Sequence, residues 1–485
     1  MKYKEATAIL CDIEQHVAVE RLRHDGLDIW PLLRLVLWRQ LGGGAPAMPP
    51  RPAARMAGIF EKLALAARAL LRPKSAYPKA EAVFFIANDE RSAMVAGKAM
   101  SPFGDSLKDY AGKIGISALT LDASRTASPY GAPFSVRPEI ALAFFRARLR
   151  RVTAASLVSA IPGFDELDGY IRRSYPHLQL DRVQLLEELR LIGTLKRSFL
   201  RVLKAVSPKS VFLACYYHPA AMGLILACRA LGIRSIEVQH GQQGDYHGMY
   251  ASWTKAEPGG YALMPDNFWC WGQQSADRIN RWSRPSWPAQ MAIVGGNPWM
   301  AQQIHQLGPP DEEAELDALF VPGMTHVLLA LQPVEDAIAA SIQQAIALSP
   351  PDTRWLIRLH PKMRAGSKAE ILGRLRAMAT RNVEIELSSS LPLAGLLKRT
   401  DFVITLWSSV AYEALLFGAH PVIAHENGLK SFQSYIDRGL FSYADSKEAI
   451  LEVLRKGRPR KVGEDSPYIE TREDVIFEML RRSVS

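Results

Sequence analysis

Residues 401–426 form the stretch that most constrains how this 485-residue chain can fold. The apolar run Phe402–Leu406 is followed by two hydroxyl residues, Ser408 and Ser409, and then by helix formers until a glycine stops them. A second apolar run, Pro421–Ala424, comes next. A strand, a helix and a strand in this order predict a βαβ unit with parallel strands.

The same alternation recurs on both sides of a break near residues 296–322. Apolar runs predict further strands at 82–87, 116–121, 210–214, 234–238, 268–271, 291–294, 326–331, 354–359 and 383–387. Helical spacing predicts helices at 185–203, 220–231, 335–348 and 368–379. The Pro- and acid-rich segment 308–323 is expected to be a linker. The fold class is therefore predicted to be α/β, with two doubly wound, Rossmann-like domains facing a cleft.

The chain is long enough for two cores, and we place the domain boundaries by composition. Residues 1–50 are expected to be a helical segment that ends in a Gly- and Pro-rich linker, and residues 51–300 the first Rossmann-like domain. Residues 320–462 would form the second domain. The helix expected in residues 463–485 would return to the first one.

Composition narrows the class of protein. The net charge of +10 and the pI of about 9.3 favour an anionic partner, such as a nucleotide phosphate or an anionic lipid. The four cysteines are far apart in sequence, so reduced core thiols are expected rather than disulfides or a zinc site. The first 20 residues carry four acids and lack an apolar core, and no run of 18 apolar residues occurs. We therefore expect a cytoplasmic protein without a metal or other cofactor.

Polar residues follow three of the predicted strands. They are Gln239, His240 and Gly241, then Arg358, His360, Pro361 and Lys362, and then Ser408 and Ser409 with Glu413 one helical turn further on. Because parallel strands end at the same edge of a doubly wound sheet, these loops are expected to line one cleft. Hydroxyl groups at a helix start and the basic residues around His360 suit a phosphate. His240 would have a pKa suited to proton transfer near neutrality.

The same residues could instead have purely structural roles. Ser408 could be only an N-cap, His240 a hydrogen-bonded loop residue, and Glu413 either a ligand of a ribose diol or a cap. His247 and Tyr250, further along the His240 loop, are expected to orient that loop, as are Gln239 and Gly241. Motifs for a P-loop, a hydrolase nucleophile elbow, a zinc protease and a dinucleotide fingerprint are absent from the sequence.

These residues also carry a resemblance. The Gln239-His240-Gly241 loop with His247 and Tyr250, the Arg358-Leu359-His360-Pro361 stretch and the Ser408–Pro421 pattern resemble bacterial surface-polysaccharide glycosyltransferases of the GT-B fold. That group includes capsule biosynthesis proteins and Kdo, sialic acid and CDP-glycerol polymer transferases. The opening Asp25–Arg34 is similar to the start of such proteins. The resemblance covers roughly residues 205–425 and this opening.

The resemblance implies a metal-independent glycosyltransferase that uses a CMP-, UDP- or GDP-sugar and a surface polysaccharide or lipid-linked glycan. Residues 320–462 would bind the donor phosphate through His360, Ser408 and Ser409, and residues 51–300 would bind the acceptor, with His240 at the reacting centre. Asp245, Asp89 and Glu90 are candidate carboxylates for catalysis. The alternatives are a UDP-sugar 2-epimerase, a glycerophosphotransferase or a non-catalytic nucleotide-sugar binding module.

Two partners are weighed beside the glycan. Basic segments at 56–72 and 146–151 are expected either to contact the inner face of an anionic membrane or to pack as ordinary helices. Nucleic acid is not expected as a partner, because the basic residues are not interleaved with aromatic side chains.

Overall fold

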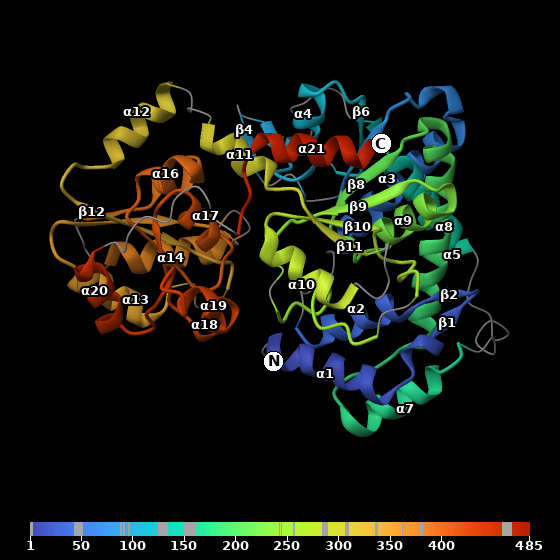
Figure 1. Ribbon diagram of the computed structural model, residues 1–485, viewed down its shortest axis with the longest axis horizontal. Helices are drawn as coiled ribbons and strands as arrows, with labels where there is room; N and C mark the ends of the chain where they lie inside the picture. The colour runs from blue at the N-terminus through green and yellow to red at the C-terminus, as the bar shows by residue number, and fades with distance from the viewer. Residues whose placement is uncertain are drawn as a thin grey trace. The chain divides into compact units, whose positions relative to one another are not determined.

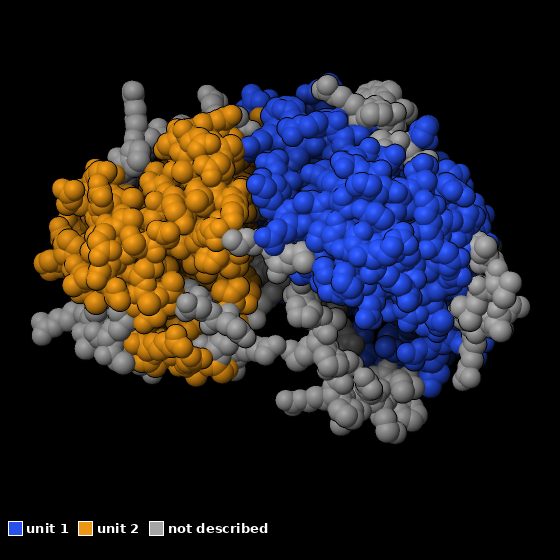
Figure 2. All heavy atoms as spheres, turned by 90° about the horizontal axis from the view of Figure 1, so that it is seen from below, with its two compact units in different colours: residues 1–299, 471–485 blue, residues 300–470 orange. Residues whose placement is uncertain are grey.

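A computed structural model of the chain describes residues 3–42, 52–87, 90, 93–95, 98–124, 134–149, 161–241, 243, 245–255, 258–283, 290–305, 310–334, 338–360, 363, 365–377, 382–457 and 468–485. It divides into two compact units, which Figure 2 distinguishes by colour. Unit 1 comprises residues 1–299 and 471–485, and unit 2 comprises residues 300–470. Helix α11 (Pro298–His305) contains the boundary between them.

Unit 1 is built on a parallel sheet of seven strands in the order β11-β10-β9-β8-β3-β6-β7. The strands are β3 (Ala82–Ile86), β6 (Ala118–Asp122), β7 (Phe134–Ser135), β8 (Ser210–Ala214), β9 (Arg234–Val238), β10 (Asn267–Cys270) and β11 (Met291–Val294). Every pairing in this sheet is parallel. The chain starts in the middle at β3, builds outward through β6 and β7, and then returns to continue from β8. The sheet therefore reverses its winding between β3 and β8, which makes it doubly wound.

The helices of this unit lie beside the sheet or pack on other helices (Figure 1). They are α3 (Pro52–Leu71), α4 (Gly104–Lys113), α5 (Arg137–Leu149), α7 (Phe164–Ser174), α8 (Arg182–Val206), α9 (Pro219–Leu231), α10 (Gln273–Ser283) and α21 (Glu473–Val484). The long helix α8 packs against α9 and α5. Gly223 on α9 allows this close approach, since a Cβ there would lie 2.6 Å from the Cβ of Leu195 on α8. At the end of the chain, α21 packs on α4, where the Tyr110 hydroxyl donates to Glu473 at 2.8 Å (Figure 1).

The N-terminal residues belong to the core of unit 1. They form α1 (Tyr3–His16), η1 (Val19–Arg21), the hairpin β1 (Arg23–His24) and β2 (Leu27–Asp28), and α2 (Trp30–Gln40). Pro31 occupies the first turn of α2, where its missing N–H costs nothing. Leu10, Trp30 and Leu33 are buried in the same apolar cluster as Phe85 and Phe199. The short elements η2 (Lys74–Ala76), β4 (Ala93–Val95) and β5 (Lys98–Met100) complete the described part of this unit.

Unit 2 has a parallel sheet of six strands in the order β14-β13-β12-β15-β16-β17. The strands are β12 (Thr325–Ala330), β13 (Thr353–Arg358), β14 (Val383–Glu384), β15 (Phe402–Thr405), β16 (His420–Ile423) and β17 (Ser442–Tyr443). In chain order this is 3-2-1-4-5-6, the order of a Rossmann sheet, with its switch point between β12 and β15.

In chain order, the helices of unit 2 precede, connect and follow these strands. They are α12 (Pro310–Leu319), α13 (Ala340–Leu348), α14 (Ala365–Ala377), α15 (Glu386–Ser390), α16 (Leu393–Arg399), α17 (Val410–Leu416), α18 (Glu426–Ser431), α19 (Gln433–Ile436) and α20 (Lys447–Lys456). Separate apolar clusters line the two faces of the sheet, with Val327 and Ile404 in one and Leu328 and Val403 in the other. Neighbouring residues on one strand point to opposite faces, so both faces are buried, as a parallel sheet requires.

The predicted fold class, two doubly wound Rossmann-like domains, is confirmed. Two local expectations are wrong. Residues 383–387 were expected to be one strand, but β14 stops at Glu384, whose carboxylate accepts the N–H groups of Leu387 and Ser388 and starts α15. The expected linker 308–323 contains α12, because Leu316 and Leu319 are buried against the sheet of unit 2.

Candidate functional site

The carboxyl ends of β12 and β15 meet at the switch point of unit 2, where a doubly wound sheet binds its ligands. Gln332 follows β12, and its side-chain oxygen accepts the main-chain N–H of Trp407, which follows β15, at 2.8 Å. This bond joins the two strand ends on either side of the switch point. Gln332 was missed from the sequence, although a polar residue directly after an apolar strand was the available signal.

Arg358 and Glu413 interact at the same edge. Burial raises the pKa of Glu413 to about 7, and the Arg358 guanidinium opposes this shift. Arg358 Nη1 donates to the main-chain oxygens of Ser388 and Leu391, at 2.8 and 2.6 Å. Arg358, which was predicted to bind phosphate, therefore holds the C-terminal end of α15 in place. Its positive charge acts on Glu413. Glu413 as a whole residue is half-buried, and the raised pKa shows that its carboxyl group is poorly hydrated.

Ser408 and Ser409 precede α17, as predicted. The Ser408 hydroxyl accepts the N–H of Val410, the first residue of α17, at 3.3 Å, from one position before the N-cap residue Ser409. Ser409 makes no side-chain capping bond, and both serines are half-buried. His360 follows β13 and is half-buried at the same edge of the sheet. The predicted ligands Pro361 and Lys362 lie outside the described residues.

A second loop, after β16, reaches this edge. His425 caps α18 by accepting the N–H of Asn427 at 3.0 Å, and its ring lies 4.7 Å from that of Trp407. Gly428 makes this packing possible, because a Cβ there would lie 2.0 Å from the main-chain oxygen of Leu406. The indole of Trp407, the imidazole of His425 and the amide of Gln332 thus lie at this edge of the unit 2 sheet.

In unit 1 polar side chains gather after β8 and β9, and β8 borders the switch point between β3 and β8. Cys215, Tyr216, Tyr217 and His218 follow β8, and Gln239, His240 and Gly241 follow β9. The Cys215 backbone has φ of +57°, a left-handed conformation that is rare for a side chain of this kind. In this conformation its N–H donates to His240 Nδ1 at 3.3 Å. The predicted residue His240 therefore lies within a polar cluster, beside residues that the sequence did not single out.

Glu237 is the central residue that sequence reasoning missed. It lies on β9, is fully buried, and accepts a hydrogen bond from the Tyr250 hydroxyl. Its other oxygen, Oε2, is buried without a hydrogen-bond partner among the described residues. Burial raises the pKa of Glu237 to about 8, against the opposing effect of Tyr250 and nearby main-chain N–H groups. The available signal was a glutamate between Ile236 and Val238 in a strand buried on both faces.

The expectation that the pKa of His240 lies near neutrality is wrong. Burial lowers it to about 4, because the cluster offers the imidazolium ion little water. The side chain of His240 is 22% exposed, so the ring still reaches solvent. Its Nε2 lies 3.5 Å from the Tyr217 hydroxyl, and the Phe103 ring packs edge-on against it. At neutral pH His240 is uncharged.

His247 and Tyr250, predicted to orient the loop, are part of this cluster. Their rings are 4.8 Å apart, and Tyr250 also contacts Tyr217 and His240. Gln239 is buried and bridges the loop, since its side chain donates to the Gly241 oxygen and accepts the N–H of Trp271.

The predicted carboxylates have other positions. Asp245 is 58% exposed and forms an ion pair with Arg278 at 2.7 Å, and no described contact joins it to His240. Glu90 accepts the N–H of Ala87 and the hydroxyl of Ser101, so it orders the start of α4. Asp89 lies outside the described residues. Glu90 is thus engaged near the carboxyl end of β3, a central strand of the sheet.

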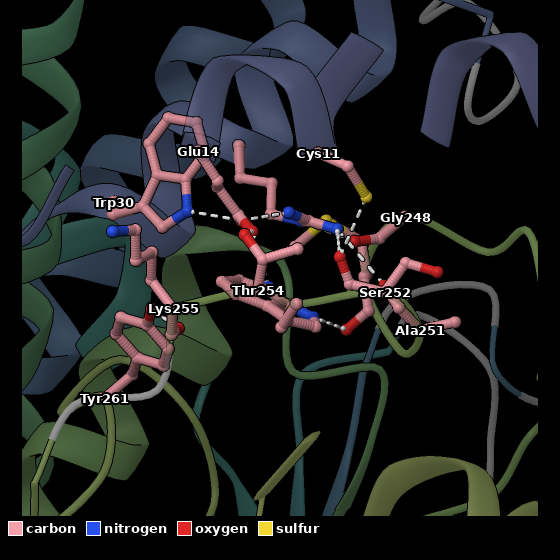
Figure 3. A network of polar contacts seen from close by, with 12 residues as sticks. Cys11, Glu14, Trp30, Gly248, Ala251, Ser252, Thr254, Lys255 and Tyr261 are labelled. Carbon is pink, nitrogen blue, oxygen red and sulfur yellow. Dashed lines mark hydrogen bonds and ion pairs between the residues drawn. The ribbon is translucent and has the colours of Figure 1, made fainter. Parts of the chain in front are cut away.

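A buried ion pair holds the segment that carries Tyr250. Arg34 on α2 and Glu14 on α1 are both fully buried and bonded to each other. Arg34 donates to the main-chain oxygens of Gly248 and Ala251, at 2.7 and 3.1 Å, while Glu14 accepts two bonds from Thr254 at 2.7 Å each (Figure 3). Arg34 is the last residue of the opening Asp25–Arg34 noted in the sequence. It thus holds the 248–254 segment in place.

Gly248 is required at this contact. A Cβ there would lie 2.5 Å from the Trp38 ring, so any other residue would push the segment away from α2. Among the described residues, no group of three His, Cys, Asp or Glu side chains could hold a metal ion. None of the described helices is both long and apolar enough to cross a membrane.

Comparison with known proteins supports the fold. No protein-family model matches the chain, and no curated protein matches its sequence. Among solved structures, the chain is similar to the UDP-GlcNAc 2-epimerase of Methanocaldococcus jannaschii, with a TM-score of 0.51 and 11% identity over 83% of this chain and 99% of that one.

Two further solved structures resemble the chain more distantly. The UDP-GlcNAc 2-epimerase of Neisseria meningitidis bound to UDP-GlcNAc has a TM-score of 0.48 and 12% identity, covering 83% of this chain and 99% of its own. The HepE protein of Anabaena in complex with UDP and glucose has a TM-score of 0.42 and 12% identity, covering 83% and 97%. The similarity shows the fold alone, two Rossmann-like domains of the GT-B type.

Proposed function

We propose that the protein is a glycosyltransferase that moves a sugar from a CMP-, UDP- or GDP-sugar to a surface polysaccharide or lipid-linked glycan. One observation carries the proposal. Two doubly wound sheets occur in one chain, and polar side chains gather at the carboxyl ends of the strands beside each switch point. Such edges are where open α/β sheets bind their ligands.

Each unit would bind one of the two substrates. Unit 2 would bind the nucleotide-sugar, with His360, Ser408 and Ser409 near the donor phosphates and the half-buried Glu413 near the ribose. Unit 1 would bind the acceptor at the edge where His240 and Tyr217 lie. Donors aimed at the leaving phosphate would stabilise the charge that develops there. We propose this chemistry without a metal ion, so EDTA should leave the turnover unchanged.

A second candidate is a UDP-sugar 2-epimerase, and one observation favours it. The solved structure with a TM-score of 0.51 is an enzyme named for UDP-GlcNAc and for inversion at C2 of its sugar. Both candidates require a nucleotide-sugar site. They differ in the product, because a transferase releases the nucleotide and an epimerase keeps it attached.

A two-step experiment tests the proposal. First, thermal unfolding is measured with CMP, CDP, UDP and GDP in turn, since a ligand at 100 times its Kd adds about 2.7 kcal/mol to the stability of the folded state. The sugar derivatives of the nucleotide that stabilises the protein are then incubated with it, and the products are separated by mass and sugar identity. Free nucleotide with a glycosylated or hydrolysed product supports transfer, and an epimeric nucleotide-sugar supports the second candidate. No stabilisation by any of the four nucleotides would contradict both.

We further propose that unit 1 contacts the surface of an anionic membrane, where a lipid-linked acceptor would lie. The described residues include eight exposed large apolar side chains, and five of them are on α3 and α5: Leu63, Leu70, Leu71, Phe144 and Leu149. Exposed cations accompany them on the same two helices: Lys62, Arg68, Arg146 and Arg148. Apolar side chains beside cations suit a lipid surface with acidic head groups.

Vesicle flotation tests this contact. The protein should float with vesicles of phosphatidylglycerol and phosphatidylcholine, and recovery should fall with added salt. Leu70→Gln/Leu71→Gln should reduce recovery, because Leu71 is 84% exposed and loses no core contact. Leu348→Gln, at a position 60% exposed in unit 2, is the matched control. Equal recovery with pure phosphatidylcholine vesicles would count against the proposal.

A further inference from the structure

The three histidines of the unit 1 cluster share one hydrogen-bond pattern. His218 Nδ1 accepts the main-chain N–H of Ala221, His240 Nδ1 accepts that of Cys215, and His247 Nδ1 accepts that of Met249. Each of these distances is 3.3 Å. A nitrogen that accepts an N–H carries a lone pair and no hydrogen, so the hydrogen of each neutral ring is on Nε2.

The surroundings keep these rings neutral. Burial lowers the pKa of His218 and His240 to about 4 and that of His247 to about 3. Arg39 and His240 lower the pKa of His218 further, and His240 also lowers that of His247. The titratable groups that face His240 are Cys215, Tyr217, Glu237, Tyr250, His218 and His247. Among these six groups only Glu237 has a pKa near neutrality, at about 8.

We propose that His240 acts as an uncharged hydrogen-bond donor through Nε2–H, and that it does not take the proton of the reacting hydroxyl group. The geometry carries this role, since the Nδ1 lone pair is occupied by the Cys215 N–H. To accept a proton at Nε2, the ring would first have to move its hydrogen to Nδ1, where it would point at another N–H. The ligand class follows from the proposed function: Nε2–H would donate to a hydroxyl or ring oxygen of the bound sugar.

One competing arrangement exists in the same cluster. Glu237 Oε1 lies 3.5 Å from His240 Nδ1, and the Val238 carbonyl favours a protonated ring. With Glu237 ionised, Nδ1–H could donate to it and leave Nε2 as a base, as in a carboxylate–histidine pair. Two observations disfavour this state. Glu237 Oε1 already accepts a hydrogen bond from the Tyr250 hydroxyl. Among the described residues of the cluster, no cation acts on Glu237 to compensate a buried negative charge.

Nitrogen NMR distinguishes the two arrangements without any substrate. The full-length protein is labelled with ¹⁵N-histidine, and two-bond ¹H–¹⁵N spectra are recorded from pH 5.5 to 8. His218→Gln, His240→Gln and His247→Gln assign the signals, and the exposed His177 provides a reference for a solvated ring. We expect His240 to show a neutral ring with hydrogen on Nε2 over the whole range. A ring with hydrogen on Nδ1, or a charge change of His240 between pH 5.5 and 7.5, would overturn the proposal.

Kinetics provide a second readout once a donor is known. Removing one positioned donor in His240→Ala should lower kcat by about 10²-fold. His240→Gln, whose amide N–H replaces Nε2–H, should recover to within about 10-fold of the wild type and keep its pH profile. Loss of one limb of that profile in His240→Gln would identify a base instead and overturn the donor role. Because the NMR experiment needs no activity, failure of the proposed transfer reaction would leave its outcome intact.

Discussion

Arg34→Met is the substitution whose effect the structure defines most sharply. The methionine fills much of the same space but has no charge and no N–H. In the wild type the guanidinium is fully buried, bonds to Glu14, donates to the oxygens of Gly248 and Ala251, and stacks 4.2 Å from the Trp253 ring. Its loss leaves the buried Glu14 carboxylate with polar neighbours but without a counter-charge.

The magnitude follows from this geometry. Removing one partner of a buried ion pair costs about 3–5 kcal/mol, because the remaining charge is uncompensated. A slope of about 3 kcal/mol per molar urea is reasonable for a unit of this size, so the midpoint of unfolding of unit 1 should fall by roughly 1 M or more. Adding Glu14→Gln to Arg34→Met removes the lone charge and should restore part of this loss.

The assay must report each unit separately, because two units need not unfold together. Pulsed hydrogen exchange at increasing urea, read by mass spectrometry, follows peptides from residues 210–238 in unit 1 and 402–423 in unit 2. We expect the first transition to shift and the second to stay. Arg21→Met is the matched control, since Arg21 forms an exposed pair with Glu166 that is worth at most about 1 kcal/mol. A shift in Arg34→Met no larger than that of the control would refute the reasoning.

Three further predictions concern binding and pH. His360→Ala, and Ser408→Ala with Ser409→Ala, should each weaken nucleotide binding by roughly 1.5–3 kcal/mol in titration calorimetry with an unchanged circular dichroism spectrum, and unchanged Kd values would remove these residues from the donor site. The three clustered histidines have folded pKa values below the unfolded value of about 6.5, so the unfolded state binds more protons, and urea midpoints of unit 1 should fall as the pH drops from 6.5 toward 4. The pKa of Glu237 is raised in the folded state, so this group contributes stability to unit 1 that is fully present below about pH 4.5 and is lost as the pH rises through 8. Glu237→Gln should abolish that loss. Parallel curves of urea midpoint against pH for the variant and the wild type would contradict this prediction.

The sequence by itself determined the architecture. Apolar runs such as 210–214 and 402–406 alternate with helical segments. This alternation predicts parallel strands buried on both faces, because the side-chain period of a strand or helix depends only on residues that are close in sequence. It also indicated the loops after β9, β13 and β15, since polar residues directly after a buried strand must lie at the carboxyl edge. Local capping decided the exceptions: Glu384 ended a strand that its apolar neighbours would have continued.

Only the tertiary structure decided which residues at those edges share an environment. Asp245 and Glu90 are predicted carboxylates, but Arg278 and Ser101 engage them. Glu237 was hidden in an apolar strand and became central because the loops after β8 and β9 surround it. The pKa of His240 could not be read from its neighbours in sequence, because burial arises from other segments of the chain, such as the one with Cys215, 25 positions away. Arg34 and Gly248 are 214 positions apart, and their contact exists only because α2 packs beneath the loop that carries Tyr250. Spacing along a chain fixes periodicity, but burial, charge and hydrogen-bond partners arise from contacts between distant segments.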